Sequence, residues 1–230
     1  MSRIVFDIET LGYKLETFDQ EQQDYLLKFA EGYEGIEEAK QKLSLYALTA
    51  QVISIAIVNP DTGQGKVLFQ SDTKEEYYSD DNKFKFESGD EKFILSEFWN
   101  ILKSYDQFIT FNGRGFDAPF LILRSAILSI PTTKNLMPYR YDHKTHCDLL
   151  EQLTFFGATR KFNLDFFCKA FGIESPKSHG VTGLDMRQLF EEKRFREIAS
   201  YCLGDTLATA SLFKSFEENI LGFQTTSHQK

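Results

Sequence analysis

Two acidic residues, Asp7 and Glu9, stand one residue apart in the apolar stretch Ile4–Thr10 near the start of the chain. The β-branched and aromatic residues around them predict a strand, and because side chains alternate between the two faces of a strand, both carboxylates would share one face. Neighbouring carboxylates repel each other unless they share a proton or a divalent cation. The spacing therefore indicates a site for a hard metal ion. Asp19 and Glu21 have the same spacing, but they lie in a polar, Gln-rich stretch that we interpret as solvated surface.

Two further acids stand where such a site could use them. Asp117 begins a predicted helix directly after a predicted strand, which is where α/β folds place ligands. Asp205 lies on the last long predicted helix, four residues after Tyr201, so the phenol and the carboxylate share one face about 5–6 Å apart. Taken alone, an Asp at the start of a helix is most often a cap, and an Asp along a helix is most often a solvated side chain. In this order along the chain, the four carboxylates supply what two-metal phosphoryl transfer requires.

The pattern of apolar residues predicts the elements that would hold these acids. Strands are predicted over residues 4–10, 52–58, 66–69 and 107–111, with a hairpin turn at 59–63. Helices are predicted over residues 91–105, 116–128, 148–153, 163–171 and 195–220, the first of them after a capping box at Ser88–Glu91. Loops are predicted over residues 71–90, 131–146 and 175–180. This order predicts an α/β fold with a mixed sheet whose first strand lies centrally.

The segment that follows the first predicted strand is longer than a connection requires. Helix-forming residues at helical spacing, as in Tyr25–Phe29 and Ile36–Leu43, predict helices there. A chain of 230 residues with 42% hydrophobic content can bury a sizeable core. We therefore expect a single domain over residues 1–230 with a helical insertion over residues 13–50.

The charge of the chain is unevenly distributed. A net charge of −8 disfavours a nucleic-acid partner at first sight, because proteins that bind nucleic acids usually carry a basic face. However, residues 16–42 hold eight acids and three lysines, and residues 72–97 hold nine acids and four lysines. The remainder of the chain carries +2 although it includes the four candidate metal ligands. The expected site thus lies in a mildly basic part of the chain.

Several other classes of protein and site receive little support. No apolar run reaches the roughly 18–20 residues of a membrane span, and acids occupy the region where a signal peptide needs an apolar core, so we expect a cytoplasmic protein. Cys147, Cys168 and Cys202 are too widely separated to indicate a disulfide framework or a zinc site, and we expect them in the core. His143 and His146 form an isolated His-x-x-His in a predicted loop, which is a weak indication of a metal site.

Three segments carry a resemblance to a known family. Phe6–Thr10, Phe111–Asp117 and Tyr201–Asp205 resemble the three exonuclease motifs of the DEDD superfamily, which has a ribonuclease-H-like fold. The Asn-Gly-x-x-Phe-Asp form of the second segment is similar to the proofreading domain of family-B DNA polymerases. Over about residues 3–215 the chain resembles the stand-alone predicted 3′-5′ exonucleases related to that domain. The resemblance implies a mixed five-stranded sheet flanked by helices.

The third motif also indicates the branch of the superfamily. The histidine branch would place its histidine five residues before Asp205, where this chain has Ser200. The tyrosine branch needs a tyrosine four residues before, and Tyr201 stands there. The chain therefore resembles the DEDDy type. The long insertion departs from the plain fold, and its role stays open.

The resemblance implies a role for each motif residue. Asp7 would bridge two metal ions, Mg²⁺ or Mn²⁺. Glu9 and Asp205 would complete the site of one ion, and Asp117 would hold the other through water. Tyr201 would orient the attacking water. The implied contacts with the substrate strand are Thr10, Leu11, Asn112 and Phe116. Arg160, Lys161 and Lys177 are candidates for phosphate contacts, although solvated surface residues explain them equally well.

The expected function is that of a metal-dependent 3′-5′ exonuclease that hydrolyses single-stranded DNA ends to nucleoside monophosphates. An exoribonuclease or an oligonucleotide phosphodiesterase on the same scaffold is the first alternative, because the sequence shows no contact to a 2′-hydroxyl. A non-catalytic nucleic-acid-binding module is the second, which loss of an acid would favour, and none is lost. A polymerase is not expected, because the exonuclease pattern spans nearly the whole chain.

Overall fold

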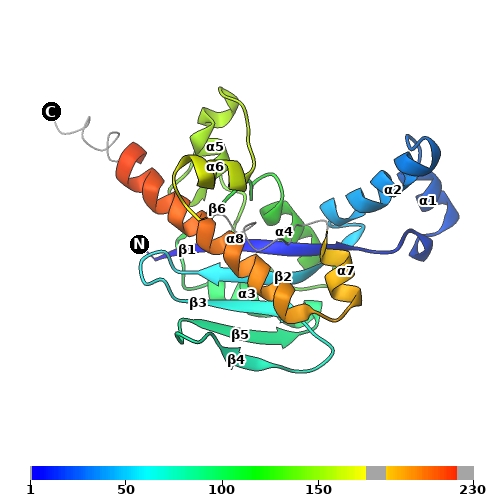
Figure 1. Ribbon diagram of the computed structural model, residues 1–230, viewed down its shortest axis with the longest axis horizontal. Helices are drawn as coiled ribbons and strands as arrows, with labels where there is room; N and C mark the ends of the chain where they lie inside the picture. Colours follow the sequence, from blue (N-terminus) through cyan, green and yellow to red (C-terminus); the bar gives the residue numbers. More distant parts are fainter. Residues whose placement is uncertain (1, 175–184, 222–230) are drawn as a thin grey trace.

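Within residues 2–174 and 185–221, which the computed structural model of the chain describes, seven strands form one mixed sheet in the order β4-β5-β3-β2-β1-β6-β7 (Figure 1). The strands are β1 (Arg3–Gly12), β2 (Ala50–Val58), β3 (Gly65–Gln70), β4 (Glu76–Tyr78), β5 (Phe84–Gly89), β6 (Gln107–Thr110) and β7 (His146–Asp148). The helices are α1 (Gln20–Leu26), α2 (Gly32–Lys42), α3 (Glu91–Leu102), α4 (Asp117–Ile127), α5 (Leu149–Leu153), α6 (Leu164–Ala170), α7 (Met186–Glu191) and α8 (Phe195–Phe216). Short 3-10 or π turns lie at Leu15–Thr17, Leu43–Leu45, Phe155–Gly157 and Glu217–Leu221.

The strand β1 lies inside the sheet, as predicted, between β2 on its antiparallel side and β6 on its parallel side. Ile4, Phe6 and Ile8 enter the core cluster that α3 and α4 cover, whereas Val5 enters the cluster beneath α8. This alternation is the period of two that a strand imposes on its side chains. It places Asp7 and Glu9 on the α8 side of the sheet.

The opposite face of the sheet holds a buried ion pair. Arg124 of α4 and Glu91 of α3 are both buried, and their nearest charged atoms lie 2.6 Å apart. Glu91 also accepts a hydrogen bond from the main-chain N–H of Val52 at 2.8 Å, and Arg124 donates to the hydroxyl of Tyr13 at 2.8 Å. Such additional bonds compensate the cost of removing two charges from water. The pair therefore connects α3, α4 and β2 to the start of the insertion.

The predicted helical insertion is confirmed, and its two helices project from the body of the protein (Figure 1). Neither α1 nor α2 contains a buried residue. The insertion is attached at its ends, where the hydroxyl of Thr10 donates to the carbonyl of Ser44 at 2.7 Å and the N–H of Tyr13 donates to the carbonyl of Thr49 at 2.8 Å. It is thus anchored beside the end of β1.

The prediction of a loop over residues 71–90 is wrong, and the sheet has seven strands in place of five. That stretch forms β4 and β5, and β5 pairs in parallel with β3. Phe84, Phe86 and Ser88 point inward from β5, and charged residues between them point outward. The sequence of β5 therefore does alternate between inward and outward residues, but the many charged residues of this stretch concealed the pattern. The capping box was also misplaced, because Asp90 caps α3 by accepting from the N–H of Phe93 at 2.8 Å.

Three smaller expectations can be compared with the structure. All three cysteines are buried and free, as expected of core residues. No helix in the described ranges is long and apolar enough to cross a membrane. The predicted loop at residues 175–180, with its candidate phosphate contact Lys177, lies outside the described residues.

Candidate active site

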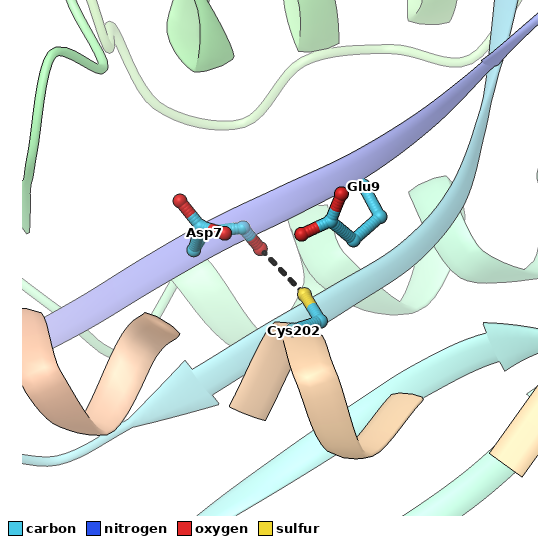
Figure 2. A group of neighbouring side chains, drawn as sticks. All are labelled: Asp7, Glu9 and Cys202. Atoms are coloured by element: carbon cyan, nitrogen blue, oxygen red, sulfur yellow. Dashed lines mark hydrogen bonds between the residues drawn. The ribbon is translucent and has the colours of Figure 1, made fainter. Parts of the chain in front are cut away.

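Asp7 and Glu9 project from β1 toward α8, where Cys202 faces them (Figure 2). One possible ligand atom from each of these three residues lies within 4.8 Å of the others. The Cys202 thiol donates to the main-chain oxygen of Asp7 at 3.5 Å. Burial, followed by the charges of Asp7 and Glu9, raises the pKa of this thiol well above its usual range, so it stays protonated. A protonated thiol is a poor ligand for a hard cation, so Cys202 supports the backbone and the carboxylates remain the candidate ligands.

Asp117 joins the pair from the first turn of α4. Its side chain is buried, and its carboxylate accepts a hydrogen bond from the main-chain N–H of Ile8 at 3.2 Å. Ile8 lies between Asp7 and Glu9, so this bond ties the second motif directly to the first. Burial is the largest cause that raises the pKa of Asp117, to about 7, with further contributions from the charges of Asp148 and Asp205.

Asp205 and Tyr201 approach the same acids from α8. Both side chains are half-buried, and the charge of the Asp205 carboxylate acts on the Tyr201 phenol, as expected of residues four positions apart on one helix. Burial, and then the charges of Asp205, Glu9 and Asp7, raise the pKa of the phenol far above its usual value. Tyr201 therefore keeps its proton at neutral pH and lies close to three of the four acids.

The four carboxylates share one electrostatic environment. Burial raises the pKa of Asp7 well above its usual range, and the charges of Asp117, Asp205 and Glu9 raise it further. Burial also raises the pKa of Glu9, followed by the charges of Asp205 and Asp117. Their oxygen atoms are the ligands that hard divalent cations prefer. The residues present therefore fit a divalent metal site.

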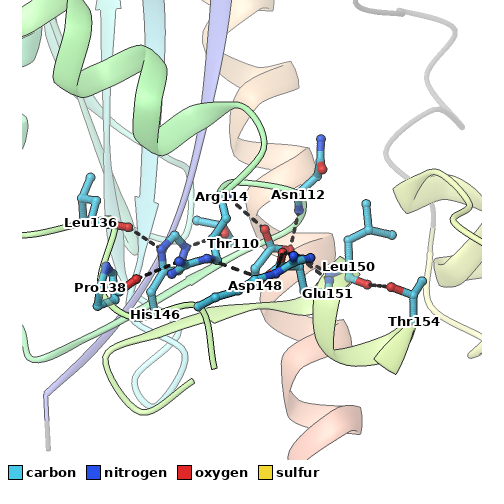
Figure 3. Close-up of polar contacts among 11 residues, drawn as sticks. Thr110, Asn112, Arg114, Leu136, Pro138, His146, Asp148, Leu150, Glu151 and Thr154 are labelled. Atoms are coloured by element: carbon cyan, nitrogen blue, oxygen red, sulfur yellow. Dashed lines mark hydrogen bonds and ion pairs between the residues drawn. The ribbon is translucent and has the colours of Figure 1, made fainter. Parts of the chain in front are cut away.

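Asp148 is a residue of this region to which the sequence assigned no role (Figure 3). It is buried at the end of β7 and accepts hydrogen bonds from the main-chain N–H groups of Asn112 at 3.0 Å, Arg114 at 2.9 Å and Leu150 at 3.0 Å. These bonds fix the loop that leads from β6 into Asp117. Its position at the start of the helix predicted over residues 148–153 indicated a helix cap, but nothing in the sequence indicated its bonds to the loop between β6 and α4.

His146 is a structural residue and not a metal ligand. Its Nδ1 lies 2.7 Å from the carbonyl oxygen of Leu136, and its Nε2 lies 2.9 Å from the hydroxyl of Thr110 (Figure 3). Burial lowers the pKa of the imidazole to about 4, so the ring is neutral at physiological pH. Because both ring nitrogens are occupied, the weak indication of a metal site with His143 is wrong.

A groove of about 380 Å³ opens where β1 runs into the insertion. Thr10 and Leu11, the residues directly after Glu9, belong to its lining, as do Lys40 of α2 and Arg187 of α7 together with several glutamates. The Thr10 hydroxyl is already bonded to the insertion and Leu11 is buried. The structure thus places these two predicted substrate contacts in a groove whose described lining includes none of the four acids.

The other predicted contacts lie around the β6–α4 loop and farther out. Asn112 is exposed, with a positive φ of 63°, and Phe116 is half-buried with its ring 5.5 Å from that of Phe120. Arg160 and Lys161 are exposed on the segment before α6. None of these side chains contacts the four acids through a described hydrogen bond or ion pair, and their role toward a substrate stays a prediction.

Comparisons with known proteins bear on the family and the fold of the chain. A family model described as a predicted 3′-5′ exonuclease related to the exonuclease domain of PolB matches residues 45–229, so Asp117 and Asp205 lie inside the match and β1 precedes it. Among solved structures, the chain is similar to the family B DNA polymerase of the hyperthermophilic archaeon Pyrobaculum calidifontis, with a TM-score of 0.59 and 16% identity. The similarity covers 94% of this chain and 24% of the polymerase, or about a quarter of its length. The ribonuclease-H-like fold is confirmed. The comparison with curated proteins found no match.

The raised pKa values predict how the stability of the metal-free protein depends on pH. An acid whose pKa is raised on folding contributes stability at low pH that is lost as the pH rises through its folded pKa, which is about 7 for Asp117. We expect the Tm in EDTA to rise by about 2–6 °C when the pH falls from about 8 to about 6.5. Thermal unfolding followed by circular dichroism measures this shift.

The variant Asp7→Asn should show a smaller rise, because one of the repelling charges is gone. His146 acts in the opposite direction at lower pH. Its pKa is lowered to about 4 in the folded protein, so below a pH of about 6.5 the unfolded chain binds a proton there that the folded protein does not, and this lowers the Tm. A Tm that is flat or that falls over the same pH interval in the wild-type protein would contradict the described clustering of the acids.

Proposed function

The chain belongs to the family of predicted 3′-5′ exonucleases related to the exonuclease domain of PolB, and from this premise we propose that it is a metal-dependent exonuclease that shortens single-stranded DNA from its 3′ end. The observation that carries the proposal is the convergence of Asp7, Glu9, Asp117 and Asp205 from three separate elements. The hydrogen bond between Ile8 and Asp117 and the mutual elevation of the pKa values of the acids support it.

The four carboxylates would hold two divalent cations, Mg²⁺ or Mn²⁺. Asp7 would contribute to both positions, Glu9 and Asp205 to one, and Asp117 to the other. When bound, such cations lower the pKa of a water molecule and offset the charge that develops on the phosphate. The protein's own contribution is to keep the carboxylates at fixed positions, which the rigid interior strand β1 and the hydrogen bond from Ile8 provide.

Tyr201 acts as a positioning donor in this proposal. Its phenol keeps its proton, because its pKa is raised by burial and by the neighbouring acids, so it is not a general base at neutral pH. The charges of Asp205, Glu9 and Asp7 all act on this phenol, so it lies close to these acids. From there it orients the attacking water.

The 3′ polarity of the proposal is based on the groove that begins at the residues after Glu9. Its lining includes Thr10 and Leu11, where the terminal nucleotide would lie. Lys40 and Ser44 of the insertion also line it, so the insertion would limit how far a strand extends beyond the acids.

Tyr201→Phe removes one hydroxyl and keeps the ring. We expect kcat to fall by roughly 10- to 1000-fold, because the lost hydroxyl positions water in the transition state. The midpoint of a Mn²⁺ titration should stay nearly unchanged, because the carboxylates are intact. Tyr25→Phe, on the exposed surface of α1, is the matched control and should leave both quantities unchanged. A midpoint displaced as far as in Asp205→Asn would make Tyr201 part of the metal site.

The direct test of the function uses DNA labelled at its 5′ end. We expect a ladder of successively shorter products, with release of nucleoside monophosphates from single strands, and complete inhibition by EDTA. A 3′-phosphate should block the reaction. Parallel RNA and dinucleotide substrates identify the exoribonuclease and phosphodiesterase alternatives by a higher kcat/KM. Labelled mononucleotide as the first product, or full activity in excess EDTA, would contradict the proposal.

A further inference from the structure

A row of four phenylalanine rings leads outward from the loop of the second motif. Phe111, the residue before Asn112, meets Phe167 edge to face at 5.7 Å between ring centroids. Phe167 meets Phe162 at 6.4 Å, and Phe162 is stacked on Phe166 at 4.3 Å with an angle of 14° between the ring planes. The row thus extends from the end of β6 to the outer surface of α6.

Only part of this row is explained by folding. Asn163 caps α6, so Phe162 precedes the cap and Phe167 is the fourth residue of the helix, which are the two positions of a hydrophobic staple. Phe167 also contributes to the core cluster beneath α8. Phe166 has neither role, and 55% of its surface is exposed. A single exposed ring is common on protein surfaces, but Phe166 extends the stacked pair that it forms with Phe162, and this larger aromatic surface is a candidate for contact with another molecule.

The surroundings of the exposed ring are basic. The guanidinium of Arg160 lies over the ring of Phe162 at 4.9 Å. In the part of the chain that the structure describes, neither Arg160 nor Lys161 forms an ion pair, and Lys169 pairs with Asp165 at 3.0 Å. A stacked aromatic pair with an arginine on it combines what single-stranded nucleic acids bind, a flat apolar surface for a base and positive charge for phosphates.

The helix α6, which carries this surface, packs against α8, the helix that carries Asp205. Burial, and then the charges of Asp165 and Asp205, raise the pKa of the Cys168 thiol on α6 to about 11, so Asp205 lies within electrostatic reach of this helix. At its inner end, the row reaches Phe111, from which the chain continues into the loop that Asp148 holds.

We propose that Phe162, Phe166 and Arg160 form a stacking platform for a base of the substrate strand upstream of the scissile bond. The proposal rests on the proposed function and adds a preference for strands several nucleotides long over dinucleotides. The occupant is a single strand and not a duplex, because only unpaired bases expose their flat faces. Stacking does not read base identity, so the platform gives affinity without sequence preference.

Other exposed rings of the chain provide a contrast. Tyr25, Phe29 and Tyr33 of the insertion are all more than three-quarters exposed, but they lie in the segment 16–42, which holds eight acids and three lysines. The acids of this segment disfavour a phosphate chain along its exposed outer face, and none of the three rings lines the groove beyond Glu9. Phe29 is therefore a matched control for Phe166, because it is 90% exposed and has Lys28 over its ring at 5.4 Å, but lies among the acids of the insertion.

The experiment compares a twelve-residue oligothymidylate with a thymidine dinucleotide. Affinity is measured by fluorescence anisotropy in the cleavage-deficient Asp7→Asn background, and kcat/KM is measured in otherwise wild-type protein. We expect Phe166→Ala to weaken binding of the oligomer and its kcat/KM by about 5- to 100-fold, the effect of one lost stack, and to change kcat/KM on the dinucleotide by less than about twofold. Phe166→Trp should restore both values, and Phe29→Ala should change neither.

Arg160→Ala tests the electrostatic part of the platform. We expect weaker binding of the oligomer and a salt dependence whose slope is smaller by about one, as for one lost phosphate contact. If Phe166→Ala lowered kcat/KM equally on the oligomer and on the dinucleotide, Phe166 would have a structural role and the platform would be wrong. A loss in Phe29→Ala as large as that in Phe166→Ala would overturn it as well.

The proposed function and the platform can fail separately. If Phe166→Ala degrades the oligomer as fast as the wild-type protein and binds it equally well, the exonuclease stands and the platform is wrong. If the wild-type protein cleaves neither substrate but its binding of the oligomer falls in Phe166→Ala, the platform stands and the exonuclease assignment is wrong.

Discussion

Repulsion between four partly dehydrated carboxylates is the constraint on which the rest of this structure depends. Burial is the largest cause that raises the pKa of Asp7, Glu9 and Asp117, and their mutual charges add to it. Such an arrangement is unfavourable for the metal-free fold, and it persists only because the surrounding elements are held together by other interactions. The core supplies those interactions on both faces of the sheet.

The positions of the acids are maintained by bonds to the backbone. The N–H of Ile8 is bonded to Asp117, the main-chain oxygen of Asp7 accepts from Cys202, and Asp148 holds the loop that ends at Asp117. Each bond connects two elements that are distant in the sequence. The site therefore needs no flexible segment to bring the acids together. The insertion contributes differently, because it buries no residue of α1 or α2 and acts as a wall of the groove beyond Glu9.

Features that depend only on residues close together in the sequence could be predicted, because a periodic pattern or a short motif indicates them. The alternation along β1, the β2–β3 hairpin and the spacing of Tyr201 and Asp205 are examples, and the structure confirms them. The sequence did not predict β4 and β5, where charged residues hide the alternation, or β7, which is three residues long and exists through its pairing with β6. The second role of Asp148 also escaped prediction, because its partners lie 34 and 36 residues away.

The central claim, that the four acids form one site for divalent cations, is tested most directly by isothermal titration calorimetry with Mn²⁺. The wild-type protein should bind the ion, Asp7→Asn should lose most of the binding because the proposed shared ligand is changed, and Cys202→Ala should bind as the wild-type protein does because a protonated thiol is not a ligand. Equal binding by wild-type protein and Asp7→Asn, or a loss of binding in Cys202→Ala alone, would contradict the account.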